Sequence, residues 1–93
     1  MVEIIWSDLA IEDLKSIHDY ISKDSTRYAA EMVERIIQRV DQLENFPNSG
    51  RIVPEFDNKL IRELIIDNYR IVYNVDEQFI SISRIHHSSK LIS

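Results

Sequence analysis

Residues 60–87 read LIRELIIDNYRIVYNVDEQFISISRIHH, a stretch in which three apolar runs are separated by two short polar segments. Apolar and polar side chains alternate through much of the runs, and this period of two is typical of strands with one buried face. The polar segments 67–68 and 76–78 contain Asp and Asn, which favour turns. The sequence therefore predicts strands over residues 60–66, 69–75 and 79–86, joined as an antiparallel meander.

Upstream of the meander, apolar residues recur every three or four positions, which is the period of an amphipathic helix. The segment 1–6 is β-branched and aromatic and predicts a strand, and Ser7 after it is a natural N-cap. A second helix is expected to begin near Asp24-Ser25 and to end near Asn45. The apolar stripes are Ala10, Leu14, Ile17 and Ile21 in the first helix, and Ala29, Val33, Ile36, Val40 and Leu43 in the second, widened by Ala30 and Ile37.

Two consecutive helices with a short polar link predict a helical hairpin, whose apolar stripes must be buried against another element. We therefore expect a single domain over residues 1–93 of the α+β class, with the order β-α-α-β-β-β. The hairpin would pack on one face of a small, mainly antiparallel sheet. A domain of this size buries only about two-thirds of the surface of its unfolded chain, so added stability from a partner is expected.

The only glycine of the chain, Gly50, follows the second predicted helix in the segment Phe46-Pro47-Asn48-Ser49-Gly50. Proline and glycine together end the helical pattern. A chain so poor in glycine needs a local reason for this one, and the sequence predicts a positive φ angle at the turn.

The net charge of −5 lies wholly in the first half, where ten acidic residues outnumber five basic ones, while residues 51–93 carry six of each. This balance disfavours long-range attraction to nucleic acid.

The absence of cysteine excludes disulfides, zinc–thiolate sites and cysteine nucleophiles, and suits a reducing cytoplasm. No apolar run approaches the ~20 residues of a membrane helix, and no leader pattern begins the chain. We expect a cytoplasmic protein with no membrane partner.

Arginine occurs in each of the three predicted strands of the meander, at Arg62, Arg70 and Arg84. Neighbouring strands can bring such residues together on one face of a sheet. One interpretation is a solvated face on which they pair with Glu55, Glu63 or Asp67. The other is a shared basic surface on the sheet face that the helices leave uncovered.

Two adjacent histidines, His86 and His87, end the last predicted strand and must point to opposite sides of it. They cannot chelate one ion together, and His18 is the only other histidine, so no metal site is expected. No cofactor is expected either, because one glycine cannot form a phosphate-binding loop.

RNA cleavage needs a base, a cation and an acid, which Glu55, Arg70 or Arg84, and His86 could supply. Tyr69 and Tyr73 could stack on bases, although packing is the favoured interpretation.

Taken in order along the whole chain, several short motifs resemble the RelE/ParE superfamily of toxins from type II toxin–antitoxin systems. The motifs are Ala10, Asp13, Leu14, Ile17, Tyr20 and Ile21 in the first helix, then Leu43, Pro47, Gly50 and Arg51, then Arg62-Glu63, Tyr69-Arg70-Ile71-Val72-Tyr73, and Ile82, Ile85 and His87. The resemblance implies a compact α+β toxin, encoded beside an antitoxin that wraps it.

Members of the superfamily act in two ways: RelE-like toxins cleave mRNA in the ribosomal A site, whereas ParE-like toxins poison DNA gyrase. Glu55, Arg70 and His86 are similar to the catalytic residues of YoeB-like nucleases, but His87 replaces the aromatic residue that follows the terminal histidine there. The lysine cluster of RelE is also missing. The turn ending in Gly50-Arg51, the Arg-Glu pair, the long helical hairpin and the acidic charge favour the ParE-like branch.

The favoured function is therefore a growth-arresting gyrase inhibitor. The alternatives are a metal-independent, ribosome-dependent mRNA endonuclease and an inactive relative that only binds its antitoxin. The catalytic residues of the nuclease would be Glu55, Arg70 and His86. The residues assigned to target or phosphate binding are Arg51, Arg62, Arg84, His87 and Lys90.

Overall fold

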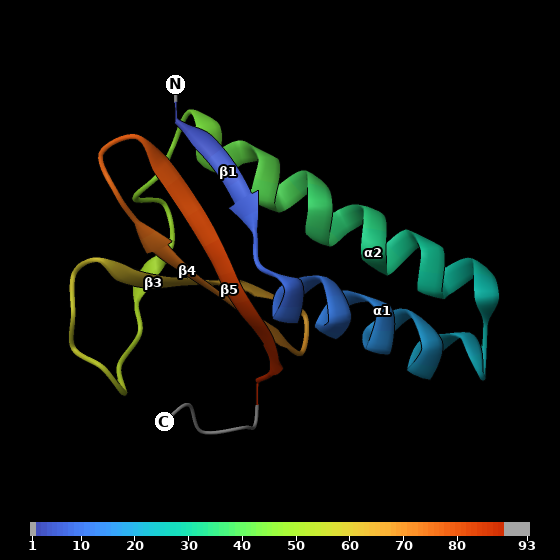
Figure 1. Ribbon diagram of the computed structural model, residues 1–93. Helices are drawn as coiled ribbons and strands as arrows, with labels where there is room; N and C mark the ends of the chain where they lie inside the picture. Colours follow the sequence, from blue (N-terminus) through green and yellow to red (C-terminus); the bar gives the residue numbers. More distant parts are fainter. Residues whose placement is uncertain (1, 89–93) are drawn as a thin grey trace.

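The computed structural model describes residues 2–88 and places two helices against a five-stranded sheet (Figure 1). The elements are β1 (Glu3–Trp6), α1 (Asp8–Ser22), α2 (Thr26–Asp41), the 3-10 turn η1 (Gln42–Glu44), β2 (Arg51–Ile52), β3 (Ile61–Ile66), β4 (Tyr69–Val75) and β5 (Phe79–His87). The α+β class and the predicted order of elements are confirmed. Strand β2 was not predicted, because two residues are too few to show a period. Within residues 2–88, neither helix has the length and apolar character needed to span a bilayer.

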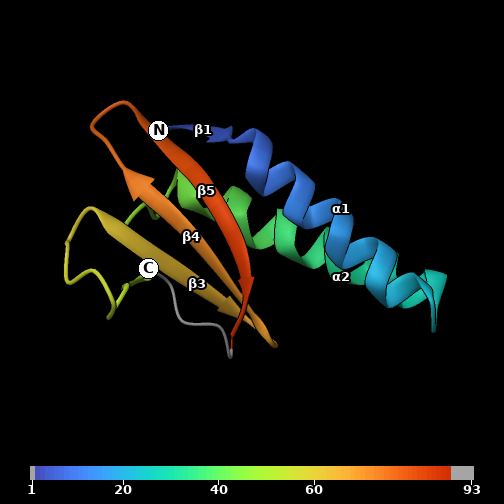
Figure 2. The same ribbon diagram turned by 60° about the horizontal axis from the view of Figure 1, so that its bottom comes forward.

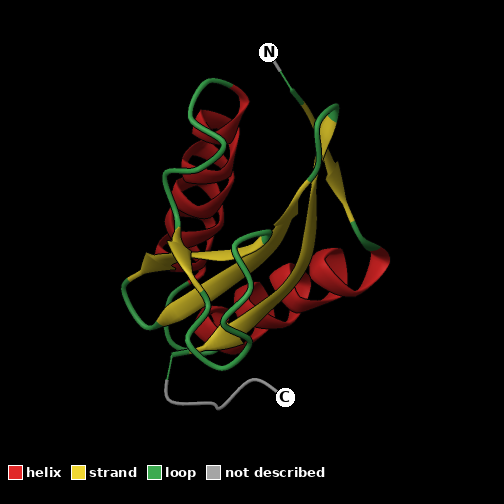
Figure 3. Ribbon diagram, turned by 90° about the vertical axis from the view of Figure 1, so that its left-hand side faces the viewer, coloured by secondary structure: helices red, strands yellow, loops and turns green. Residues whose placement is uncertain are grey.

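The sheet has the strand order β1-β5-β4-β3-β2 and is mainly antiparallel, as expected. Its parallel pair joins β1 to β5, with Glu3 opposite Phe79 and Trp6 opposite Ile82. The first and last strands of the chain therefore lie side by side in the sheet, with β1 beside the first half of β5 (Figure 2). Seen from the sheet side, the strands stand in front of both helices, and one face of the sheet is left without a helix (Figure 3).

Serine side chains begin both helices. The Ser7 hydroxyl accepts a hydrogen bond from the backbone N–H of Ala10 (3.0 Å) and donates one to the Ser83 carbonyl of β5 (2.8 Å). Ser25 accepts one from the N–H of Tyr28 (3.0 Å). Each serine satisfies an N–H group that would otherwise lack a partner at the helix start. Ser7 also fixes α1 to the sheet, which the sequence did not indicate.

The main core lies between the helices and the covered face of the sheet. The buried residues of α2 and η1 are Ala29, Met32, Ile36, Val40 and Leu43. All of them except Ala29 belong to one core cluster with Leu64, Ile66, Ile71, Tyr73, Ile80, Ile82 and Ile85 of the strands. The predicted stripe is thus right except at one position, where Met32 is buried and Val33 only half-buried. Ala30 and Ile37 are exposed and do not widen the stripe.

A bulge in β5 keeps its apolar residues on the covered face. Val72 of β4 is opposite Arg84 and Tyr73 is opposite Ile82, so Ser83 is the extra residue. The Ser83 hydroxyl donates to the Val72 carbonyl (3.1 Å). Because the bulge inserts one residue, Ile82 and Ile85 both enter the core although they are three positions apart.

Gly50 has no positive φ angle, so the predicted reason for this glycine is wrong. The residues with positive φ are Asp57 (48°) and Asp67 (49°). Gly50 is needed for space: a Cβ atom there would lie 2.6 Å from the Glu63 carbonyl oxygen and 2.6 Å from the Tyr73 hydroxyl. The N–H of Gly50 donates to the Tyr73 hydroxyl (2.9 Å), which donates in turn to the Pro47 carbonyl (2.9 Å).

Candidate functional site

Four charged side chains form a compact ionic network on the sheet face that carries no helix: Arg51, Glu55, Glu63 and Arg70. Arg70 Nη1 and Nη2 donate to the two carboxylate oxygens of Glu55 (2.7 and 2.8 Å), and Arg70 Nε donates to Glu63 Oε1 (2.6 Å). Arg51 Nε donates to the other oxygen, Glu63 Oε2 (2.7 Å). Arg70 is only 5% exposed and Glu63 only 1%. We call this set the sheet-face network.

Strand register brings the network together. Glu63 of β3 is opposite Arg51 of β2 on one side and Val72 of β4 on the other, which makes Arg70 its diagonal neighbour on the same face. The segment after β2 folds back over this face because Val53 packs against Val72 in a small second cluster. Backbone N–H groups at residues 56 and 57 donate to the Val53 carbonyl, forming the turn that presents Glu55.

Charge pairing within the network stabilises its buried members. Hydrogen bonds to Glu55 and then to Glu63 raise the pKa of the Arg70 guanidinium above its ordinary value, against the opposing effect of burial. Two carboxylates and two guanidinium groups make the network neutral. Removing one partner would leave an uncompensated charge in a buried place, which is far costlier than losing a surface ion pair.

The three residues predicted for a nuclease lie together in the structure. His86 of β5 is the direct cross-strand partner of Arg70, and Glu55 binds Arg70 through both oxygens. However, in this arrangement the candidate base and the candidate cation bind each other. A phosphate that approached Nη1 and Nη2 of Arg70 would have to compete with the Glu55 carboxylate for them.

Arg62 and Arg84 lie outside this network, so the predicted surface shared by three strand arginines is not formed. Arg62 Nε donates to the Lys59 carbonyl (3.1 Å) and Nη1 to the Gly50 carbonyl (2.9 Å), which fastens the loops around β2. Arg84 binds Asp13 of α1 through two hydrogen bonds (2.8 and 3.1 Å). The three arginines thus have separate partners: carbonyl groups for Arg62, Glu55 and Glu63 for Arg70, and Asp13 for Arg84.

Asp13 joins α1 to β5. Its Oδ2 atom accepts from Arg84 Nε (2.8 Å) and from the backbone N–H of Ile85 (2.9 Å). Partial burial raises the pKa of the Asp13 carboxyl, but the hydrogen bonds from Arg84 and Ile85 outweigh it and leave the pKa below the ordinary value of 3.8. No structural role was predicted for Asp13 beyond its place in the family resemblance, since nothing local links it to a strand 71 positions away.

The second terminal histidine lies on the other side of β5, as predicted. His87 meets the ring of Tyr69 edge to face, with the centroids 6.0 Å apart and the planes at 81°. Together with Asp13, Tyr20 and other residues, these two rings line an opening of about 490 Å³ between α1 and the strands. Lys90, the last of the predicted target-binding residues, lies outside the described residues.

Other predicted features are also located by the structure. Tyr69 and Tyr73 share a strand face, but Tyr73 is fully buried and cannot stack on a base. Between residues 2 and 88, no three histidine, cysteine, aspartate or glutamate side chains are grouped so as to hold a metal ion. Glu63 was predicted only as a solvated partner. The sequence signal that could have indicated a buried ion pair was the position of this charged residue in the middle of an apolar strand.

The sequence matches the family described as ParE toxin of type II toxin-antitoxin system, parDE, over residues 4–92. It is also 33% identical over 92 residues to Toxin RelE2 of Caulobacter vibrioides, covering 98% of this chain and all of the relative.

Solved structures show the same fold. A chain of the chromosomal ParDE TA system from P. aeruginosa has a TM-score of 0.77 at 26% identity, covering 94% of this chain and 96% of that one. A chain of the DinJ-YafQ complex of E. coli has a TM-score of 0.66 at 12% identity, and both chains are covered completely. The YoeB dimer from Staphylococcus aureus has a TM-score of 0.57 at 23% identity, covering 92% of this chain and 95% of that one. By its sequence match over almost the whole length, this chain belongs to the ParE toxin family, within the RelE/ParE superfamily of type II toxins.

Proposed function

We propose that this toxin arrests growth by binding DNA gyrase and inhibiting it, and that it does not cut mRNA. The observation that carries the proposal is the double hydrogen bond between Arg70 and Glu55. A nuclease needs its cation available to the phosphate and its base available to the 2′-hydroxyl. Here the candidate cation, Arg70, and the candidate base, Glu55, bind each other, and Arg70 Nε donates to Glu63 as well. The match to the ParE family and the net charge of −5 support the same conclusion.

A supercoiling assay tests the proposal. Purified toxin at increasing ratios to gyrase should stop the supercoiling of relaxed plasmid and should trap cleaved DNA, seen as linear plasmid after detergent and protease. The His86→Ala variant should inhibit equally, because gyrase inhibition does not need the nuclease residues. Normal supercoiling at a large excess of folded toxin would count decisively against the proposal.

The second candidate is the ribosome-dependent mRNA endonuclease, which is favoured by the proximity of Glu55, Arg70 and His86. In this case ribosome binding would have to separate Glu55 from Arg70. The test is codon-positioned cutting of mRNA in a translation extract, abolished by His86→Ala. His86 is better suited than Arg70 for this variant, since removing Arg70 would take a hydrogen-bonding cation from both Glu55 and the buried Glu63 and would destabilise the fold. Intact mRNA with the wild-type toxin would exclude this function.

We further propose an antitoxin as the partner of this chain. The solved structures with the same fold include two toxin–antitoxin pairs, ParDE and DinJ-YafQ. The product of the short reading frame beside this gene should co-purify with the toxin and relieve growth arrest. If expression of the toxin alone does not arrest growth, the chain is an inactive relative, and the antitoxin would then be its only partner.

A further inference from the structure

The outer edge of β3 is covered by β2 over only part of its length. Strand β2 pairs Arg51 with Glu63 and Ile52 with Arg62. Beyond Glu63, no residue in the described part of the chain pairs with β3 on that side, while β4 pairs with it on the other. Ile65, in the middle of this segment, is 49% exposed. Residues 64–66 therefore form an open strand edge.

Backbone polarity along this edge follows from one hydrogen bond. The N–H of Val53 donates to the Ile61 carbonyl (3.1 Å), so the Ile61 carbonyl points away from β4 toward the outer edge. In an antiparallel pair, backbone groups point alternately to one neighbour and the other. Ile65, four positions after Ile61, thus directs its N–H and carbonyl groups outward, where a further strand could pair with them.

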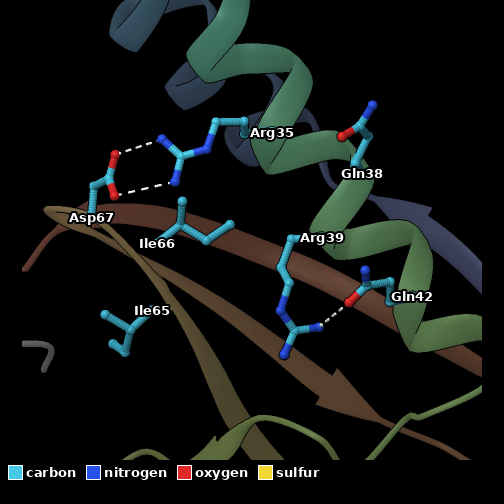
Figure 4. A pocket seen from close by; sticks show the side chains of 7 residues that line it. All are labelled: Arg35, Gln38, Arg39, Gln42, Ile65, Ile66 and Asp67. Carbon is cyan, nitrogen blue, oxygen red and sulfur yellow. Dashed lines mark hydrogen bonds and ion pairs between the residues drawn. The ribbon is translucent and has the colours of Figure 1, made fainter.

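A positively charged rim on α2 lies beside this edge. Arg35, Gln38, Arg39 and Gln42 line an opening of about 400 Å³ together with residues 65–67 (Figure 4). At one end Arg35 binds both oxygens of Asp67 (2.8 and 3.2 Å), which neutralises its charge. Arg39 instead donates to the neutral side chain of Gln42 (3.1 Å), and this contact leaves its positive charge unbalanced. Figure 4 shows Arg35 and Arg39 reaching from the helix toward the strand.

We propose that this edge binds an extended, acidic segment of the antitoxin, which adds a strand beside β3 and places a carboxylate at Arg39. This inference rests on the proposed function, because it takes the antitoxin proposed there as the partner. Backbone pairing at Ile65 would provide affinity, and Arg39 would select an acidic side chain. A second copy of this chain fits poorly, since it would bring its own Arg39 to the same edge and would offer no free carboxylate there, its Asp67 being bound to Arg35.

Hydrogen–deuterium exchange on the purified toxin–antitoxin complex tests the site directly. The Ile65 amide should exchange at least about tenfold more slowly in the complex than in the toxin alone, because a hydrogen bond to a new strand replaces one to water. If the complex forms and Ile65 exchanges as fast as in the toxin alone, this inference is overturned while the proposed partner stands. If no complex forms, the proposed partner fails, and the inference falls with it.

Two variants separate the backbone and charge contributions. Ile65→Pro removes an N–H that β4 does not use, and proline is tolerated in an edge strand at such a position. It should weaken antitoxin binding, whereas Ile65→Val should not. Circular dichroism and the melting temperature of the toxin alone check that the proline variant is folded.

Arg39→Gln tests the carboxylate contact and should weaken binding about tenfold, as expected for the loss of one charge-assisted hydrogen bond. The matched control is Arg27→Gln on the same helix, whose exposed side chain pairs with Glu31. Equal affinities for the Arg39 and Arg27 variants would overturn the carboxylate contact. Protection of Ile65 by a single-stranded RNA oligonucleotide, without protection by the antitoxin, would assign the edge to nucleic acid and overturn the proposal.

Discussion

Gly50 is buried against the backbone of β3 and the hydroxyl of Tyr73, and it leaves no room for a side chain. Gly50→Ala should lower the free energy of unfolding by about 2–4 kcal/mol, because backbone at Glu63 cannot move aside as a flexible side chain could. Urea denaturation measures the change, with the exposed neighbour Ser49→Ala as control. An alanine variant as stable as wild type would contradict the steric role.

Tyr73 satisfies two backbone groups with one hydroxyl, the N–H of Gly50 and the carbonyl of Pro47. Tyr73→Phe keeps the buried ring and removes only the hydroxyl. It should cost about 1–3 kcal/mol, because both groups lose their partner in a buried place. The same denaturation assay measures the loss, and Tyr20→Phe, at an exposed position, should change nothing. Burial also raises the pKa of the Tyr73 hydroxyl, so it stays protonated and able to donate at neutral pH.

Side-chain hydrogen bonds hold α1 to β5. The Ser7 hydroxyl, at the start of the helix, donates to the Ser83 carbonyl, and Asp13, about one and a half turns further along, binds Arg84. Asp13→Asn removes the charge from the pair with Arg84 and should destabilise the protein by about 1–3 kcal/mol at pH 7. The pKa of Asp13 is lower in the folded state than its ordinary value of 3.8. Its contribution is therefore fully present above about pH 4 and is lost as the pH falls through the lowered value.

Denaturation of both proteins across pH measures this contribution. The difference in unfolding free energy between wild type and Asp13→Asn should be constant from pH 7 to 5 and should shrink toward pH 3. A difference that does not change with pH would show that the carboxylate charge is not what ties α1 to β5. Arg84→Gln should give a pH dependence of the same sign but smaller, since Asp13 still accepts the hydrogen bond from the Ile85 N–H.

At the scale of the whole molecule, the sheet-face network joins three strands and the loop that carries Glu55. Glu63 is its central acceptor, because it receives hydrogen bonds from both Arg51 and Arg70. Glu63→Ala should destabilise the protein by about 3–5 kcal/mol, the range found when one partner of a buried ion pair is removed. Arg27→Ala, which breaks an exposed pair on α2, should cost less than about 0.5 kcal/mol.

The same network should govern the position of the loop at residues 54–59. Glu55→Gln keeps the size of the side chain and removes its charge, so the loop should exchange its amides faster. The variant should also be less stable than wild type, because the buried Arg70 loses one of its two carboxylate partners. Hydrogen exchange measures the effect on the loop, with Glu77→Gln in the β4–β5 turn as a control. Unchanged exchange at residues 54–59 would show that the loop is held by Val53 packing alone.

Much of the fold was predictable from periodicity. The alternation over residues 60–87 gave β3, β4 and β5 within one residue at each end, and the helical stripes with Ser7 and Ser25 gave α1 and α2. These features depend on neighbours a few positions apart, and such patterns are visible in a single sequence. Glu55, Arg70 or Arg84, and His86 were proposed as a set from the chemistry of RNA cleavage, and the family resemblance then favoured Arg70 as the cation.

Contacts between distant residues settled the remainder. The parallel pairing of β1 with β5, the tie between Asp13 and Arg84 and the steric need for Gly50 all join positions far apart in the chain. The separate partners of Arg62, Arg70 and Arg84 have the same origin. A guanidinium binds whichever carboxylate or carbonyl the folded chain brings within about 3 Å, and no local pattern records which one that is.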